Sequence, residues 1–157
     1  MNSLFFLIVL ITLTVSQAFG RTAVSIAPIT TTDTCPGSVN GGISAGPLIL
    51  TISPKYFFKN NSTPSSVPSG FSWDGSFSDI SNPANLMLSQ SVGSITLLSP
   101  ISTLTDGSKI QAQCIYQKPF TLTTSGGAQV NTYVKYTLLG PQRAAPCHTS
   151  GNSLICP

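Results

Sequence analysis

Two runs of alternating side chains constrain the fold of this 157-residue chain more than any other feature. They lie on either side of Ser125-Gly126-Gly127, and the residues that share one face of each run are mostly apolar and stand at every second position: Ile110, Ala112, Cys114 and Tyr116, then Val130, Thr132, Val134, Tyr136 and Leu138. A strand that is half buried needs this period, because successive side chains leave opposite faces. Thr105-Asp106-Gly107 offers a turn before the first run. Residues 108–139 therefore predict antiparallel β-structure.

The rest of the chain predicts more short strands between stretches rich in Gly, Pro, Ser and Asn. We expect strands over 23–29, 47–53 and 94–99, and the second of these continues at 56–58. We also expect a hairpin or bulge around Gly75. We expect loops over 30–42 and 60–70. Residues 81–88 fit a helix capped by Asn82, with Pro83 in its first turn, and residues 86–88 fit a strand equally well. About eight strands result, which predicts an all-β fold, an antiparallel sandwich with a barrel as the alternative.

The beginning of the chain has the pattern of a secretory signal peptide. Residues 4–13 are apolar apart from Thr12, and small residues follow them. Cleavage fits after Ala18 or after Gly20, which divides the chain into a leader over 1–20 and one domain over 21–157. The alternative is a buried N-terminal strand of a cytosolic protein. No later segment has the length and apolarity of a membrane span, so we expect a secreted, extracellular product.

All four cysteines follow the leader, and an even count in a secreted chain predicts two disulfide bonds. Three pairings are open. We favour Cys147 with Cys156, because Ser150-Gly151-Asn152 can reverse the chain between them, which leaves Cys35 with Cys114. Metal ligation is the rival interpretation, but C-x-x-C spacing is missing and His148 is the sole nitrogen ligand. We expect no metal and no cofactor.

Two overlapping N-glycosylation sequons begin at Asn60 and Asn61, within a stretch rich in Pro and Ser that should be exposed. Charged residues make up 7% of the chain, and the formal charge of +3 comes from scattered lysines and arginines. Lys55 and Lys59 are the nearest basic pair, which a solvated strand edge explains. A nucleic-acid-binding surface is therefore not expected.

The titratable residues limit what catalysis is open to the chain. It has no Glu, four Asp and one His. His148 has no nucleophile elbow near it and lies next to a cysteine of a predicted disulfide, so an exposed loop position explains it. Asp74 and Asp79 are the nearest pair of carboxylates for glycan hydrolysis, but turn positions explain both. We expect a protein that is not an enzyme and has no catalytic residues, with a small glycan hydrolase as the weakest alternative.

Aromatic residues on either side of the sequons are the candidates for binding. Trp73, Phe71 and Tyr56 have side chains that stack on sugar rings or anchor a protein partner. The competing explanation is that they fill the core of the domain. Trp73 is the first to test, because it neighbours Asp74 and Gly75.

At the level of protein class, the chain resembles the small, cysteine-containing secreted proteins that plant-associated fungi such as rusts deploy as effectors. The resemblance rests on the leader, the short domain, the four cysteines and the lack of catalytic machinery, and it transfers no site residue. It implies a virulence protein that binds a host protein. We therefore expect a secreted, non-enzymatic protein that engages a host or extracellular protein. The alternative is a cell-wall or matrix protein that binds polysaccharide through aromatic residues.

Overall fold

The computed structural model describes residues 27–53, 55–79, 89–98 and 100–157. The predicted leader and the candidate helix over 81–88 lie outside these residues. So does most of the expected strand over 23–29, whose described part, 27–29, is not in a strand. Within the described ranges, no helix has both the length and the apolarity needed to cross a membrane.

The described residues form twelve strands and no helix, which confirms the all-β class. The strands are β1 (Thr31–Thr34), β2 (Ser38–Ile43), β3 (Ala45–Ile52), β4 (Lys55–Asn60), β5 (Ser72–Asp79), β6 (Gln90–Thr96), β7 (Ser102–Asp106), β8 (Lys109–Thr123), β9 (Gln129–Leu139), β10 (Arg143–Ala144), β11 (His148–Ser150) and β12 (Ser153–Cys156). They make a seven-stranded sheet, a three-stranded sheet and a two-stranded ribbon.

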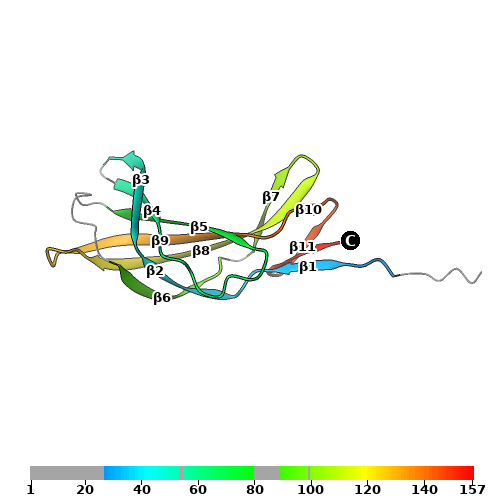
Figure 1. Ribbon diagram of the computed structural model, residues 1–157, viewed down its shortest axis with the longest axis horizontal. Coiled ribbons are helices and arrows are strands. Elements are labelled where there is room, and N and C mark those ends of the chain that lie inside the picture. Colours follow the sequence, from blue (N-terminus) through cyan, green and yellow to red (C-terminus); the bar gives the residue numbers. More distant parts are fainter. Residues whose placement is uncertain (1–26, 54, 80–88, 99) are drawn as a thin grey trace, which may run out of the picture.

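The seven-stranded sheet has the order β10-β8-β9-β5-β4-β3, with β7 on the other side of β8, and it curls into half a barrel (Figure 1). Its centre is the hairpin that the two alternating runs predicted. β8 and β9 pair from Gln113 opposite Leu139 to Thr123 opposite Gln129. Gly107 and Gly127, in the turns before β8 and β9, have φ angles of 58° and 80°, a region that favours glycine.

The ribbon of β2 and β6 covers one face of this sheet (Figure 1). Apolar side chains of the two layers meet in one buried cluster, to which the ribbon contributes Val39, Ile43 and Ile95 and the sheet contributes Tyr116, Tyr136 and other residues. In β8 and β9, the side chains that enter the core belong to the every-second-residue sets seen in the sequence, such as Ala112 and Val134. The core therefore lies between the ribbon and the long hairpin.

A buried hydrogen-bond network holds the ribbon to the sheet at Asn60 and Tyr136, whose side chains have no exposed surface. The Asn60 amide nitrogen donates to Gly42 O at 2.8 Å and to the Tyr136 hydroxyl at 3.0 Å. Its carbonyl oxygen accepts from the backbone N–H groups of Ser44 and Ser62 at 3.0 and 3.1 Å. One side chain thus satisfies four polar groups of three segments.

The three-stranded sheet, β1-β12-β11, lies at one end of the molecule, and two kinds of link tie it to the rest. Arg143 of β10 donates to both carboxylate oxygens of the buried Asp33 of β1, at 2.6 and 2.8 Å. This hydrogen bonding raises the pKa of the Arg143 guanidinium above its ordinary value. The other link is a disulfide bond between Cys35, which follows β1, and Cys114 of β8.

Both disulfide bonds have the favoured pairing. Cys35 bonds to Cys114 across 79 positions of sequence, and Cys147 bonds to Cys156 across nine. No cysteine in the described residues is free. The pairing is compatible with an extracellular protein, because such bonds persist in oxidising surroundings. It also leaves no thiolate for metal ligation or nucleophilic catalysis in this part of the chain.

Four expectations about the elements were wrong. Residues 56–58 do not continue the strand expected over 47–53; they belong to β4, which pairs antiparallel with β3. The predicted loop over 30–42 contains β1 and most of β2, because polar threonines and glycines there pair with β12 and β6. Gly75 lies in the middle of β5 and not in a hairpin or bulge. A Cβ on Gly75 would come within 3.0 Å of the Tyr136 ring, so this glycine makes room for an aromatic side chain. The strands also number twelve in the described residues, not about eight.

Candidate ligand-binding face

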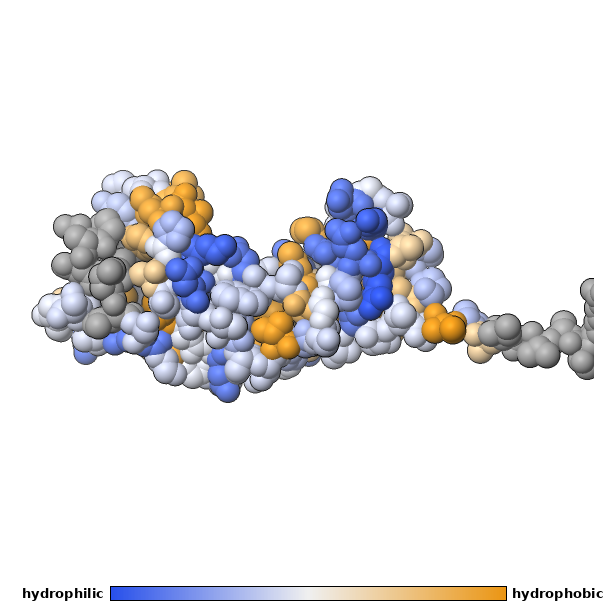
Figure 2. All heavy atoms as spheres, in the orientation of Figure 1, coloured by the Kyte–Doolittle hydropathy of each residue, from blue (hydrophilic) through white to orange (hydrophobic). Residues whose placement is uncertain are grey.

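The face of the seven-stranded sheet that points away from the ribbon is hollowed, and we call it the upper face. The β3–β4 hairpin rises at one end of it and the β7–β8 hairpin at the other, so that β5, β9 and β8 form a floor between two walls (Figures 1 and 2). Six residues of the floor and its margin define the candidate site: Phe57, Lys59, Ser76, Gln117, Tyr133 and Lys135.

Strand register places these residues in two adjacent rows. Lys59 pairs with Ser76, Ser76 with Lys135, and Lys135 with Gln117, which makes one row across four strands. Phe57 and Tyr133 belong to the next row, on either side of Ser78. Paired residues point to the same face of a sheet, and their neighbours Phe58, Phe77 and Val134 point into the core. The two rows therefore face the hollow.

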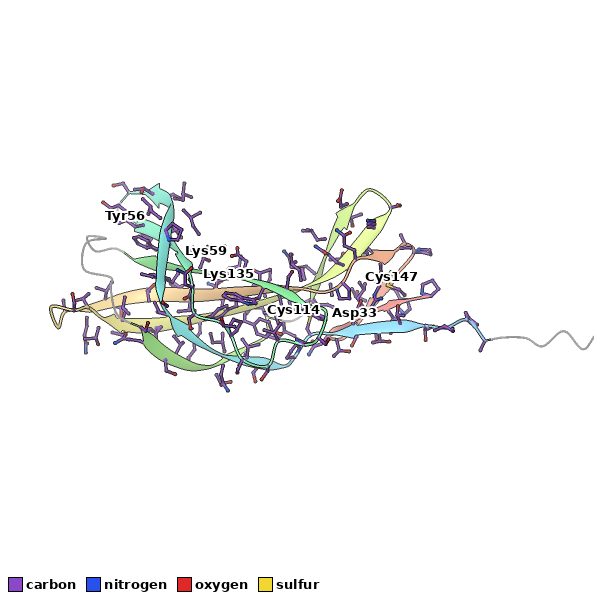
Figure 3. All side chains as sticks on the ribbon, in the orientation of Figure 1. Asp33, Tyr56, Lys59, Cys114, Lys135 and Cys147 are labelled. Atoms are coloured by element: carbon purple, nitrogen blue, oxygen red, sulfur yellow. A yellow bond between two sulfur atoms is a disulfide. The ribbon has the colours of Figure 1, made fainter. Side chains whose placement is uncertain are left out.

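The upper face carries positive charge. Lys59 and Lys135 are separated by one strand, so their Cα atoms lie about 10 Å apart, and Figure 3 shows both over the floor of the sheet. Lys59 Nζ lies 3.7 Å from a carboxylate oxygen of Asp74, in a pair that is more than half exposed. Such a pair is weak in water. Lys135 forms no ion pair within the described residues, so one ammonium group is left to meet a ligand.

Apolar surface lies beside the two lysines. Tyr133 is 50% exposed, Phe57 is half-buried, and together with Lys135 they line a pocket of about 110 Å³. A phenol and a phenyl ring next to ammonium groups suit a ligand with both apolar and acidic groups.

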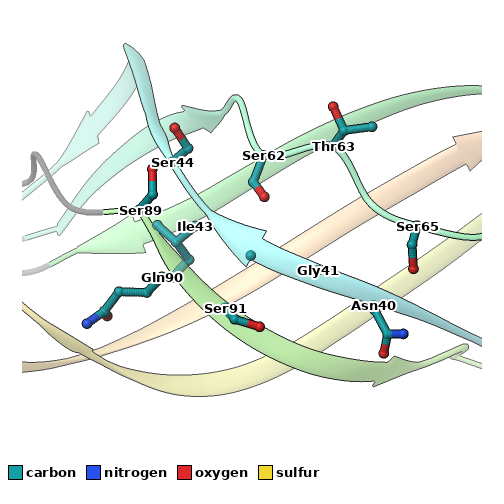
Figure 4. A pocket seen from close by; sticks show the side chains of 11 residues that line it. Asn40, Gly41, Ile43, Ser44, Ser62, Thr63, Ser65, Ser89, Gln90 and Ser91 are labelled. Carbon is teal, nitrogen blue, oxygen red and sulfur yellow. The ribbon is translucent and has the colours of Figure 1, made fainter.

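A second hollow lies between the ribbon and the loop that follows β4 (Figure 4). It has a volume of about 350 Å³, and its lining is uncharged: Asn40, Gly41, Gly42, Ile43, Ser44, Ser62, Thr63, Ser65, Ser89, Gln90 and Ser91. Hydroxyl and amide groups there can donate and accept hydrogen bonds. No lining side chain is an acid, a base or a thiol, so the hollow suits binding of a neutral polar group.

The three aromatic candidates do not form one binding platform. Tyr56, Phe71 and Trp73 are all partly buried and pack against the core, and the Trp73 ring lies edge-on to Tyr136 with 6.0 Å between centroids. Tyr56 pairs with Asp79 at one end of β5, whereas Trp73 lies six residues away, about 20 Å along the strand. Core packing thus accounts for these residues.

The two aspartates considered for hydrolysis lie far apart along the backbone of β5. Asp74 and Asp79 are five residues apart in one extended strand, which puts their Cα atoms about 17 Å apart. Carboxyl pairs in glycosidases lie within about 10 Å. Asp74 is also the partner of Lys59.

His148 is exposed as expected, but it lies in strand β11 and not in a loop. Across the described residues, no group of three or more His, Cys, Asp or Glu side chains comes together as metal ligands.

The two sequon asparagines differ in their surroundings. Asn60 is fully buried, and its amide nitrogen makes the two hydrogen bonds described above. Asn61 is exposed, and its amide nitrogen lies 3.5 Å from Ala45 O. Of the two, the fold presents only Asn61 at the surface.

Sequence reasoning missed the upper face. It treated Lys59 as part of a solvated edge and Lys135 as a scattered charge. The alternation of β9 does show that Tyr133 and Lys135 share the outward face, but only the register of β4, β5 and β9 brings Lys59 beside them. Comparisons with known protein families, with curated proteins and with solved structures find no match to this chain. The interpretation of the upper face therefore rests on its own residues.

Proposed function

We propose that this protein is a secreted, non-enzymatic binding protein that engages a host or extracellular protein through its upper face. The observation that carries the proposal is the row formed by Lys59, Ser76, Lys135 and Gln117, next to Phe57 and Tyr133, in the hollow between two hairpins. An effector role agrees with the resemblance in leader, size and cysteine content.

The chemistry of the face favours a protein partner with acidic and apolar side chains. One carboxylate can lie between the ammonium groups of Lys59 and Lys135, while an apolar side chain packs on Phe57 and Tyr133. Exposed tyrosine is common among the residues that dominate protein interfaces, and complementary charge directs association. The chain holds seven basic and four acidic residues, which adds a favourable long-range field for an acidic partner.

Secretion is supported by the leader pattern and is compatible with the two disulfide bonds. We propose Asn61 as the acceptor of an N-linked glycan, because the side chain of Asn60 is enclosed. A glycan on Asn61 lies at the start of the loop after β4, on the surface.

The polar hollow supports a second candidate, binding of a cell-wall or matrix polysaccharide. Neutral hydroxyl and amide groups such as those of Asn40 and Gln90 are the partners that sugar hydroxyls need. This candidate places the sugar at the ribbon and not on Trp73, whose ring packs on the core.

The test is affinity capture with the purified protein, from the extracellular fluid and tissue of the organism on which it acts. We expect one stoichiometric protein partner. A Lys135→Glu, Tyr133→Ala double variant should bind it at least tenfold more weakly, because a carboxylate replaces the ammonium group and the apolar anchor is lost. The matched control is Lys109→Glu, an identical charge change at the end of the β7–β8 hairpin, which should bind normally.

Equal binding by the double variant would refute the upper face as the site. The same proteins are applied to chitin, cellulose and β-glucan, with Trp73→Ala and Asn40→Ala alongside. Retention on a polymer that Asn40→Ala weakens would replace the protein-binding proposal with the polysaccharide one. Retention that Trp73→Ala weakens would restore the aromatic site.

A further inference from the structure

Strand β3 exposes aliphatic side chains on both of its faces. Leu48, Ile49, Leu50 and Ile52 are 50%, 57%, 50% and 58% exposed. Leu48 pairs with Phe58, whose side chain enters the core, whereas Leu50 pairs with Phe57, whose side chain faces the hollow. The register shifts between these two pairs, and Ile49 is the extra residue of a bulge. Figure 2 shows apolar surface over this hairpin.

A ligand on the upper face covers only one side of β3, so it leaves part of this apolar surface in water. β3 is also an edge strand, and β4 is its only partner strand in the described part of the chain. A strand added along the open edge flanks both faces at once and bonds to backbone groups that the sheet leaves unpaired. Pro47 has no N–H to donate, so the pairing uses residues 48–52, the part of β3 that carries the exposed aliphatic side chains. Strand addition thus accounts for both the open edge and the two-sided exposure.

We propose that the occupant is β3 of a second copy, which pairs antiparallel to give a twofold dimer with one continuous sheet. Residues 45–52 carry no charge, so two such strands meet without repulsion and without burying an unpaired ion. The opposite edge of the sheet, β7, has five residues and ends in Asp106. The uncharged eight-residue edge best suited to β3 is therefore another β3.

Symmetry closes this assembly at two copies. A twofold interface uses the same patch on each subunit, so pairing through β3 leaves no β3 edge open for a third copy. Two paired eight-residue strands bury less than the about 1,600 Å² of a standard interface. We therefore expect a reversible dimer that dissociates on dilution.

The test is sedimentation velocity on the purified secreted protein, without the leader over 1–20, from 1 to 100 µM, with two variants of the same kind. Leu50→Lys puts an ammonium group on the β3 edge, and Leu104→Lys does so on β7, where the leucine is 44% exposed. We expect the wild type and Leu104→Lys to reach twice the monomer mass at the highest concentration. Leu50→Lys should remain a monomer, with an unchanged far-ultraviolet circular dichroism spectrum.

A wild type that stays monomeric at 100 µM overturns the proposal, as does a Leu50→Lys variant that dimerises normally. Loss of the dimer in Leu104→Lys, or growth beyond two copies, also contradicts it. Amide hydrogen exchange of the wild type gives a second measurement that needs no variant. Protection within 45–52 should rise with concentration, and unchanged protection there in a dimeric sample would place the interface elsewhere.

Discussion

The Asn60 amide makes four hydrogen bonds, with Gly42 of the ribbon, with Tyr136, and with the backbone N–H groups of Ser44 and Ser62, and it has no exposure to water. We predict that Asn60→Ala lowers the free energy of unfolding by about 3 kcal/mol, because the partners lose their bonds inside the protein. Denaturant unfolding of unglycosylated protein measures this.

Asn61→Ala is the matched control, since the neighbouring asparagine is exposed, and its effect should stay within about 0.5 kcal/mol. Equal effects of the two substitutions would show that the network contributes little.

Because of Tyr116, the free energy of unfolding should decrease at alkaline pH. Its side chain is buried and its hydroxyl donates to Pro36 O at 2.7 Å, while burial raises the pKa of the phenol from 10.0 to about 12. The unfolded chain therefore loses this proton near pH 10 and the folded protein keeps it. The stabilisation is complete below pH 10 and is lost as the pH rises toward 12.

Tyr116→Phe removes the titrating group. We predict that the difference in unfolding free energy between wild type and this variant narrows by about 1 kcal/mol between pH 9 and pH 11. Chemical denaturation at a series of pH values measures it. A difference that stays constant over this range would mean that the phenol titrates normally in the folded state.

Among the elements, β8 and β9 were the most predictable, because the alternation in their sequence is local and the turn residues stand at both ends. The strands that sequence patterns missed depend on distant partners. Thr31–Thr34 becomes a strand because it pairs with β12, more than a hundred positions later. Gly75 weakens the pattern of β5 and yet sits at its centre, because the Tyr136 ring needs the space.

The elements also explain why the candidate site could be predicted only in part. Aromatic residues were sensible candidates by type. The alternation in β5 puts Trp73 on the same face as Phe77, but it does not show by itself that this face is the one turned toward the core. The upper face depends on the register of four strands, of which only β8 and β9 form one hairpin whose turn sets their register. Lys59 and Lys135 are 76 positions apart, and only pairing through β5 brings them together.

At the scale of the whole molecule, the two disulfide bonds differ in the segments that they connect and in how much they should stabilise the fold. Cys147–Cys156 closes a short hairpin, whereas Cys35–Cys114 joins the terminal sheet to the central hairpin. The chain-entropy model gives about 3 kcal/mol for the short loop and about 4.5 kcal/mol for the long one. Cys35 and Cys114 are both buried, at 2% and 0% exposure, whereas in the other pair Cys156 is buried and Cys147 is only partly buried, so replacing Cys35 and Cys114 leaves the larger cavity.

We predict that the double replacement Cys35→Ala with Cys114→Ala lowers the unfolding free energy by at least about 1.5 kcal/mol more than Cys147→Ala with Cys156→Ala. Denaturant unfolding of both variants under non-reducing conditions measures the difference. Equal losses would mean that the link between the two sheets adds nothing beyond the closing of a hairpin.

The pairing of β1 with β12 puts the two ends of the described chain at the same end of the molecule. Thr31 lies opposite Cys156, so the first and last described segments run side by side at one end, away from the β3–β4 hairpin (Figure 1). If the protein were attached to a surface through its C-terminal residue, the β1–β12 end would lie next to that surface and the β3 edge would face away from it. On a sensor surface, molecules attached in this way would present β3 and the upper face to whatever flows past.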